Sequence, residues 1–484
     1  MSVFDDLFQK ITALITAFLM TLFGFGGAVK GNDAIPEVAS GAITLGSVPE
    51  QPVLNDTPIV KAGAAVSPSL KSISSFGNTN MIDKFTDSVK GGTYFYACGT
   101  DSLAGFSLSF IVKYDSSGNQ IWKKVISEGN GQTALSGITY TNGNALVVCG
   151  YVSSSASGSS SPDRNAVVMK YDLDGNRVWK KVYKGSENDH FSKICALTDG
   201  GTVVCGKTYS VDGSFDGIPD YGYSCGFLMR LDKDGNRVWM RYLGASGASD
   251  VSDIDSDTSN NIFISASSFA SDGDFGAFKN SVANSLDNYI VKYNKDGVMQ
   301  WNYTLSSNYR DYFDCVAADG SGGCYAGGFF ANTGGNNFIT AGTLAKTMII
   351  GGNDAYVVSI SAYGVKKWDV SLGGSLDDTV NSISKEGNYI AVSGYTNSYS
   401  GTFPTNEGGS DAFVTLINTS GNIAGTVMLG GSESDAAACC TYADSVLTVF
   451  GYSASQDGDF DGINTTATVN TYEFYDCFVA QYDL

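Results

Sequence analysis

Histidine and basic residues are scarce in this sequence. It has one histidine, His190, and 29 lysines and arginines against 49 aspartates and glutamates, which gives a formal net charge of -20. A single histidine excludes histidine-rich metal sites and argues against a Ser-His-Asp triad. The excess of acids argues against nucleic acid and anionic lipid headgroups as partners, because binding to phosphates needs clustered lysine and arginine.

Proline is also rare, at 8 residues, whereas glycine reaches 59. Hydrophobic residues make up 43% of the chain and aromatic residues 12%, which excludes a disordered acidic chain. Strong helix formers are scarce after the first thirty residues, while Gly, Ser, Thr, Asn, Tyr, Phe and Val dominate. This balance favours an all-β fold for most of the chain.

The N-terminus contains one long apolar run. Residues 11–29, ITALITAFLMTLFGFGGAV, are uncharged and long enough to cross a bilayer as a helix. The run could also be a secretory signal, although acids precede Lys10 where a signal peptide prefers bases. Its apolar residues recur at three-four spacing, which suits helix association. We therefore expect a hydrophobic helix over residues 1–30 that acts as a membrane anchor, a cleaved signal or an assembly helix.

The prolines mark a second region. Residues 31–68 contain five of the eight prolines, which predicts an extended linker. The third region, residues 69–484, is repetitive. All five tryptophans follow the same kind of turn, as in DLDGNRVW and DKDGNRVW, and lie 57, 60, 62 and 67 residues apart, at Trp122, Trp179, Trp239, Trp301 and Trp368. A sixth copy, NTSGNIAG, puts Gly425 in the tryptophan position. Such periods indicate a propeller or a solenoid.

Each repeat holds four strand-like segments, which is one propeller blade. The last repeat stops after its third strand, at CFVAQYDL, and SLKSISSFG, residues 69–77, matches the missing fourth strand ahead of the first repeat. The N-terminal strand can therefore complete the last blade and remove two open sheet edges. With about 59 residues per repeat, the sequence predicts a seven-bladed β-propeller over residues 69–484.

The repeats resemble a known family. Residues 373–422 contain Gly-Gly, an Asp, a strand ending in Gly-Tyr-Thr-Asn-Ser, then Phe-Pro and Gly-Gly-Ser-Asp-Ala-Phe-Val. This pattern is similar to the SBBP repeat of bacterial seven-bladed propellers, strongly in repeats five to seven and more loosely before. The resemblance implies the propeller fold and a frequent extracellular or surface setting, and it implies no common activity.

An aspartate recurs just before the first strand of six repeats. These are Asp83, Asp189, Asp250, Asp311, Asp378 and Asp435. Propeller symmetry could arrange them as a ring that binds a cation or a basic partner. An aspartate that recurs in the repeats more often serves the structure of each blade than one shared binding site. We therefore expect these aspartates to cap turn amides.

Two acid-rich loops are candidate calcium sites. SQDGDFDGIN places Asp457, Asp459 and Asp461 at alternate positions, and SVDGSFDGIPD offers Asp212, Asp216 and Asp220. Alternating carboxylates with glycine between them can wrap Ca2+, but neither loop has the later bidentate acid of a full calcium loop. The alternative is a polar turn in which the carboxylates bond nearby amides. No other cofactor is expected.

The ten cysteines show no zinc spacing. Cys98, Cys149 and Cys205 share one strand position in successive repeats, which favours small-residue packing over disulfides. Cys195 with Cys205, and Cys315 with Cys324, flank hairpin turns and could pair across strands.

Catalytic chemistry has little support in the sequence. His190 follows Asp189, on the repeated aspartate position, and has no identifiable nucleophile partner. The insertion at residues 331–353 explains the longest spacing, and it looks like a contact loop rather than a catalytic one. We therefore expect a non-enzymatic structural or interaction protein, extracellular or on a cell surface, or a subunit of an extracellular or viral assembly. Its partners would be a protein or its own copies through the N-terminal helix, or a membrane through residues 11–29. A module that binds glycan or protein, with or without Ca2+, is the alternative, and a propeller hydrolase or lyase is the third reading.

Overall fold

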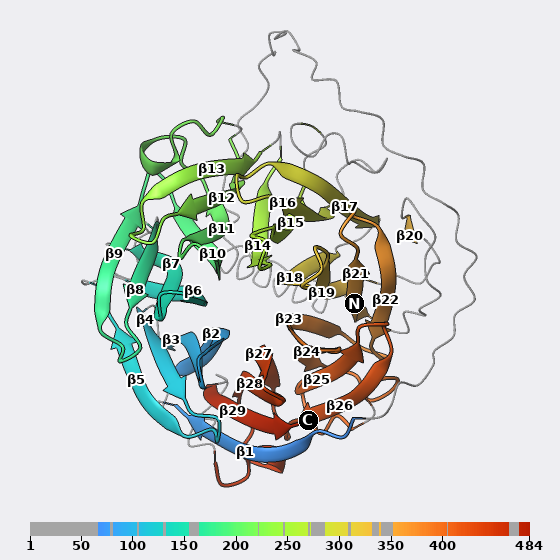
Figure 1. The fold of residues 1–484 in the computed structure, drawn as a ribbon. Helices are drawn as coiled ribbons and strands as arrows, with labels where there is room; N and C mark the ends of the chain where they lie inside the picture. The colour runs from blue at the N-terminus through green and yellow to red at the C-terminus, as the bar shows by residue number, and fades with distance from the viewer. Residues whose placement is uncertain are drawn as a thin grey trace, which may run out of the picture. The chain divides into compact units, whose positions relative to one another are not determined.

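Seven antiparallel sheets surround a common centre (Figure 1), and each is one blade. The computed structural model describes residues 66–77, 81–103, 106–128, 132–153, 164–220, 222–244, 247–269, 272, 286–307, 311–331, 338–339, 352–403, 405–463 and 474–484. The predicted helix over 1–30 lies outside these residues, and so does the predicted linker except for 66–68. Among the described residues, no helix has the length and apolarity needed to cross a membrane.

The blades are numbered one to seven in chain order, with strands given from the innermost to the outermost. Blade one holds β2 (Ile82–Gly91), β3 (Tyr94–Leu103), β4 (Phe106–Tyr114) and β5 (Gln120–Ile126). Blade two holds β6 (Thr133–Thr141), β7 (Ala145–Ser153), β8 (Arg164–Tyr171) and β9 (Arg177–Tyr183). Blade three holds β10 (Asp189–Ala196), β11 (Thr202–Thr208), β12 (Cys225–Leu231) and β13 (Arg237–Leu243). Blade four holds β14 (Ser249–Ser256), β15 (Ile262–Ser268), β16 (Asp287–Tyr293) and β17 (Met299–Ser307).

Blade five holds β18 (Tyr312–Ala318), β19 (Cys324–Ala331), β21 (Asn353–Ile360) and β22 (Lys366–Leu372). Blade six holds β23 (Asp378–Glu386), β24 (Tyr389–Thr396), β25 (Asp411–Asn418) and β26 (Ile423–Leu429). Blade seven holds β27 (Asp435–Ala443), β28 (Val446–Ser453), β29 (Asp476–Asp483) and, outermost, β1 (Ser69–Phe76). Two short 3-10 helices, η1 (Gly213–Phe215) and η3 (Gly458–Phe460), lie in loops. The all-β, seven-bladed prediction is confirmed.

The first and last strands of the ring are paired. β1 runs antiparallel to β29, with Ser69 opposite Asp483 and Phe76 opposite Cys477. In Figure 1 the blue β1 lies along the red β29, and the innermost strands β2 and β27 are in contact. Blade seven therefore takes its fourth strand from the N-terminal side of the propeller, as the sequence predicts, and its outer edge is covered.

The core consists of separate apolar clusters, each between two neighbouring blades. At the junction of blades seven and one, Phe85 packs against Phe110 and Phe450 with ring centroids 5.6 and 5.1 Å apart. Phe76 of β1 packs edge-on against the first two of these rings. The closing strand is therefore tied to the first blade by aromatic packing as well as by its ladder to β29.

The structure adds one strand that the sequence did not predict. Within the insertion at residues 331–353, Phe338–Ile339 forms β20. In the sequence β20 lies between two strands of blade five, but it pairs with β17 of blade four, with Ser306 opposite Ile339. A two-residue pairing carries no hydrophobic alternation from which it could be recognised in the sequence.

The hairpin turns before the outer strands follow one pattern. In DLDGN the Asp172 carboxylate accepts hydrogen bonds from the amides of Asp174 and Asn176, at 3.0 and 2.8 Å, and from the Asn176 side chain. These bonds lower the pKa of Asp172 below its ordinary value, with the Asn176 side chain as the largest contribution. Gly175 follows with a φ of 79°, which favours glycine. The acids of this motif therefore stabilise a turn.

Candidate functional site

Every innermost strand carries a β-bulge at the same place. The register shifts between Phe85 and Asp87 in β2, and at the matching positions of the other six: Leu135/Gly137, Phe191/Lys193, Val251/Asp253, Phe313/Cys315, Val380/Ser382 and Ala437/Cys439. A bulge puts two successive residues opposite one and turns their side chains out of the regular alternation. At this level of the ring the bulges therefore present polar side chains to the adjacent blades.

The bulged residue often donates to the next blade. Thr86 Oγ1 donates to the carbonyl of Leu135 at 3.0 Å, and Ser136 Oγ donates to the carbonyl of Phe191 at 2.7 Å. Asn381 Nδ2 makes the same bond to Ala437 O at 2.9 Å. Each acceptor is the residue just before the bulge of the next innermost strand. These bonds satisfy carbonyls on strand edges that no further strand can pair.

The residue after the bulge accepts a hydrogen bond in return. Asp87 Oδ2 accepts from the Ile138 amide at 2.9 Å, and Asp253 Oδ2 accepts from the Val316 amide at 2.8 Å. Ser382 Oγ accepts from the Cys440 amide at 3.4 Å. Side chain–backbone hydrogen bonds thus join the innermost strands of different blades, whereas backbone–backbone hydrogen bonds join the strands within a blade.

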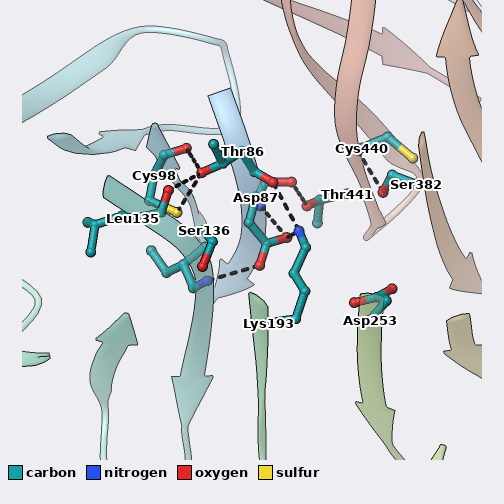
Figure 2. A network of polar contacts seen from close by, with 12 residues as sticks. Thr86, Asp87, Cys98, Leu135, Ser136, Lys193, Asp253, Ser382, Cys440 and Thr441 are labelled. Carbon is teal, nitrogen blue, oxygen red and sulfur yellow. Dashed lines mark hydrogen bonds and ion pairs between the residues drawn. The ribbon is translucent and has the colours of Figure 1, made fainter. Parts of the chain in front are cut away.

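Lys193 is the exception to this pattern and links non-adjacent blades. From β10 of blade three its Nζ lies 3.1 Å from Asp87 Oδ1 and donates to the carbonyl of Thr86 at 2.9 Å, both in blade one (Figure 2). The intervening blade has Gly137 at the equivalent position. A Cβ on Gly137 would lie 3.1 Å from the Cα of Lys193 and 2.9 Å from Cys149 Sγ. Glycine therefore leaves the room that the lysine uses.

Burial and neighbouring charges shift the pKa values of Lys193 and of two carboxyl groups on the innermost strands, Asp253 and Asp314. Burial alone would lower the pKa of Lys193, but the carboxylates of Asp87 and Asp253 outweigh it and raise the pKa above its ordinary value. Burial raises the pKa of Asp253 to about 7, against the opposing effect of Lys193. Burial also raises the pKa of Asp314, in β18, to about 7. This group of residues, with Thr86, is called the inner network below.

Five of the repeated aspartates share one fully buried position. Asp189 accepts hydrogen bonds from the Gly185 amide at 2.9 Å and from the hydroxyls of Thr208 and Ser210. Asp378 and Asp435 make the matching bonds to the amides of Gly374 and Gly431, each at 3.0 Å. Asp83 and Asp311 are buried at the same position. Three of these carboxylates thus cap turns inside the blades, and all five are too buried to form an exposed ring for a cation or a basic partner.

Asp250 does not belong to this set, which corrects the sequence alignment. The β14–β15 register puts Ser249, opposite Ser268, where the other blades have the aspartate, and Asp250 is one residue further on. Because successive residues of a strand point to opposite faces, Asp250 points the other way and pairs with Lys207 Nζ at 2.7 Å. Ser249 Oγ instead accepts a hydrogen bond from the amide of Gly226, in β12 of blade three, at 2.9 Å.

The repeated tryptophans connect blades one to five, each to the blade that follows it. The indole N–H groups donate to the second residue of the following blade's hairpin turn: Trp122 to Leu173 O at 3.3 Å, Trp239 to Lys295 O at 3.1 Å, Trp301 to Ala362 O at 2.8 Å and Trp368 to Thr419 O at 3.0 Å. Trp179 lies over the equivalent turn glycine, since a Cβ on Gly235 would be 2.8 Å from its ring. The tryptophans are therefore half-buried clamps on the outer strands.

Residues 238–273 match the SBBP family, described as a beta-propeller repeat. The chain carries an SBBP repeat. The matched segment includes Trp239 and runs from the outermost strand of blade three into blade four, whereas the sequence resemblance had pointed more strongly to repeats five to seven. No curated protein matches this chain.

Solved structures similar to this chain include a WD40 propeller domain, an endosialidase and a peptidase. The WD40 beta-propeller domain of Doa1 has a TM-score of 0.45 at 11% identity, over 86% of this chain and 97% of that chain. The phage phi92 endosialidase has a TM-score of 0.44 at 10% identity, over 86% and 69%. The acylaminoacyl peptidase of Pyrococcus horikoshii has a TM-score of 0.40 at 11% identity, over 76% and 49%. At these identities the likeness concerns the fold alone.

The acids of the candidate calcium loop point toward backbone amides. Asp457 Oδ1 accepts from the Ser432 amide at 2.8 Å, and Asp459 Oδ2 accepts from the Gly430 amide at 3.1 Å. Asp461 follows η3, and its amide donates to the Gly458 carbonyl. Across the described ranges, no three acids, cysteines or histidines are grouped so that they could hold a metal ion. This loop lies in blade seven, outside the matched residues 238–273, and the bonds of Asp457 and Asp459 to backbone amides are those of the turn alternative.

The histidine and the cysteines are buried in the same framework. Burial, with Lys207 nearby, lowers the pKa of His190 to about 4, so the ring is neutral at physiological pH. All ten cysteines are free and buried. Cys205 lies opposite Lys193 rather than Cys195, and Cys324 lies opposite Ala318 rather than Cys315, so neither hairpin pair meets. Burial raises the pKa of Cys149 to about 12, which suppresses the thiolate.

Proposed function

We propose that this chain is a non-enzymatic structural or interaction protein whose acidic propeller serves as a rigid scaffold. The observation that supports the proposal is the use of its repeated polar groups. Residues of the inner network, three of the buried aspartates and four of the tryptophans bond to neighbouring turns or blades. A catalytic site needs a nucleophile or base that is free to meet a substrate. In this chain the repeated polar side chains bond to neighbouring parts of the ring instead and so stabilise the fold.

The groups best suited to chemistry are also poorly placed for it. His190 is neutral and has a low pKa, so it is a weak base. The cysteine thiols are buried and raised in pKa, which keeps them protonated near neutral pH, for example at Cys440, where burial raises the pKa to about 11. These features favour a scaffold over a propeller hydrolase or lyase.

The setting that we propose is extracellular or on a cell surface, with the N-terminal segment as the means of attachment. The apolar run at residues 11–29 and the resemblance to SBBP propellers support this proposal. An assembly subunit that uses the same segment for self-association is the alternative within the proposal.

The test uses the full-length protein. Its mass in neutral detergent-free buffer is measured by light scattering, and its binding to zwitterionic vesicles by flotation. We expect a multimer or a vesicle-bound protein, because contact with water is unfavourable for a run of nineteen uncharged, mostly apolar residues. A monomer that stays in solution, or turnover of ester, glycoside or peptide substrates, would contradict the proposed function.

A further inference from the structure

One end of blade three contains a cavity of about 360 Å³. It lies between the β9–β10 turn, residues 184–188, and the described parts of the connection from β11 to β12, residues 209–220 and 222–224. Ligand pockets usually measure about 300–1,000 Å³, so this one suits a small ligand. The cavity lies outside the inner network and involves none of the tryptophan clamps.

Hydrogen bonds fix the two walls of the cavity to each other. The Ser186 amide donates to Asp212 Oδ1 at 2.8 Å, and the Glu187 amide donates to Ser210 Oγ at 2.9 Å. Ser210 Oγ in turn donates to the buried Asp189 at 3.2 Å. Because the walls are anchored to a repeated capping aspartate, the cavity exists before any ligand arrives, and little ordering cost opposes binding.

The cavity is lined by two carboxylates, by hydroxyl groups and by two tyrosine rings, those of Tyr209 and Tyr223. Glu187 forms no ion pair with the described lysines and arginines, and no basic residue lines the cavity. Asp220 accepts the Gly222 amide at 2.9 Å through one oxygen, which leaves the other oxygen for a ligand. Tyr223 and Val211, which are 58% and 38% exposed, also line the cavity. The lining therefore combines hydrogen-bond acceptors with aromatic and apolar side chains.

We propose that this cavity binds a sugar that carries both hydroxyl and ammonium donors, an amino sugar. Glu187 and Asp220 accept hydrogen bonds from its donors, and an ammonium group gains from being charge-assisted. The apolar face of the sugar ring packs on Tyr223, as amphipathic ligands pack on aromatic side chains. Two carboxylates without a base would repel an anionic sugar. The inference rests on the proposed function, because it names the class of ligand that the propeller scaffold binds.

Calorimetric titration of the full-length protein with a glucosamine trimer tests the proposal. We expect saturable binding that Glu187→Gln and Tyr223→Ala each weaken by about tenfold or more, as expected when a charge-assisted bond or a packed ring is lost. The melting temperature should stay unchanged, because both side chains are exposed. Trigalacturonate, an anionic trimer, should not bind.

The matched controls use the same residue types elsewhere. Glu433 occupies the equivalent turn of blade seven, where its amide donates to Ser455 Oγ at 3.0 Å, so Glu433→Gln should leave binding unchanged. Tyr363, 87% exposed on a turn of blade five, provides Tyr363→Ala.

The proposal would be overturned by a lack of saturable binding, by cavity variants that bind the trimer as tightly as the unchanged protein does, or by a preference for a lysine tripeptide. Cleavage of the trimer would overturn the non-enzymatic function while leaving this binding site in place.

Discussion

A single lysine joins three blades at the centre of the ring. Lys193 of blade three pairs with Asp87 of blade one and lies in the field of Asp253 of blade four. Both members of the pair are mostly shielded from solvent, with side-chain exposures of 23% and 19%. A pair in such a position is costly to break, because the remaining charge keeps its burial cost without its partner.

Lys193→Met tests this role. We expect it to reduce the free energy of unfolding by about 1–3 kcal/mol, discounted from a fully buried pair because some solvent remains. Adding Asp87→Asn should restore part of the loss, since the uncompensated carboxylate is removed. Urea denaturation at neutral pH measures both variants. A single-variant change within about 0.5 kcal/mol, the range of ordinary surface substitutions, would contradict the role.

Buried carboxylates give a second prediction at this scale. Burial raises the pKa of Asp253 and Asp314 to about 7, from 3.8, and that of Asp435 also to about 7. In the folded protein these groups hold their protons to higher pH than in the unfolded chain. The free energy of unfolding should therefore fall as the pH rises from about 4 to about 7.

Thermal unfolding across this pH range measures the slope. Asp314→Asn should flatten it, because an amide cannot ionise, whereas Asp461→Asn at an exposed turn should leave it unchanged. A melting temperature that rises between pH 5 and pH 8, with the same slope in Asp314→Asn, would show that these carboxylates are ionised in the folded protein.

At the scale of elements, the surroundings of one position on the outermost strand explain why blade six lacks the repeated tryptophan. Gly425 occupies that position in blade six, and the segment leading into β1 crosses over it. The Val66 amide donates to Ala424 O at 2.9 Å. A Cβ on Gly425 would lie 2.4 Å from the Val66 carbonyl oxygen. In blade seven β1 and β29 are not consecutive in the sequence, so no hairpin turn joins them and a tryptophan at position 425 would have no turn to clamp.

Gly425→Trp should therefore displace the segment at Val66 and lower the free energy of unfolding by about 1–3 kcal/mol, the usual cost of overpacking. Ser72→Trp is the matched control. Ser72 of β1 lies over the turn glycine Gly118, as the tryptophans lie over the glycines of other turns. A tryptophan side chain at position 72 should therefore lower the free energy of unfolding by less than about 1 kcal/mol. Chemical denaturation compares the two. Equal losses would mean that the crossing at Gly425 has no special steric demand.

The repeat spacing predicts the blade strands well, and the limits of the prediction are specific. Trp and turn-glycine positions recur with clear spacing, so strand order and closure follow from them. The bulges carry no such mark: Thr86, Ser136 and Asn381 look like ordinary strand residues in the sequence. Asp250 was misplaced because an aspartate next to a serine can shift by one position without disturbing the hydrophobic pattern around it. The cavity in blade three depends on a loop that no repeat pattern describes.

At the scale of the whole molecule, ring closure decides stability. A blade with an open edge exposes unpaired backbone groups and a row of strand hydrophobics. Here β1 covers that edge, and Phe76 joins the aromatic cluster between blades seven and one. The apolar clusters lie between blades, so each blade is stable only with both neighbours in place. Loss of the closing strand should therefore weaken two junctions together.

Deletion of residues 69–77 from the full-length protein tests this account most directly, with deletion of residues 31–39, of equal length, as the control. Thermal unfolding and size-exclusion chromatography are measured on both. The account predicts a lower melting temperature and aggregation for the first deletion only, because it exposes the edge of β29. An unchanged melting temperature and the elution volume of the intact protein would contradict closure of the propeller by β1.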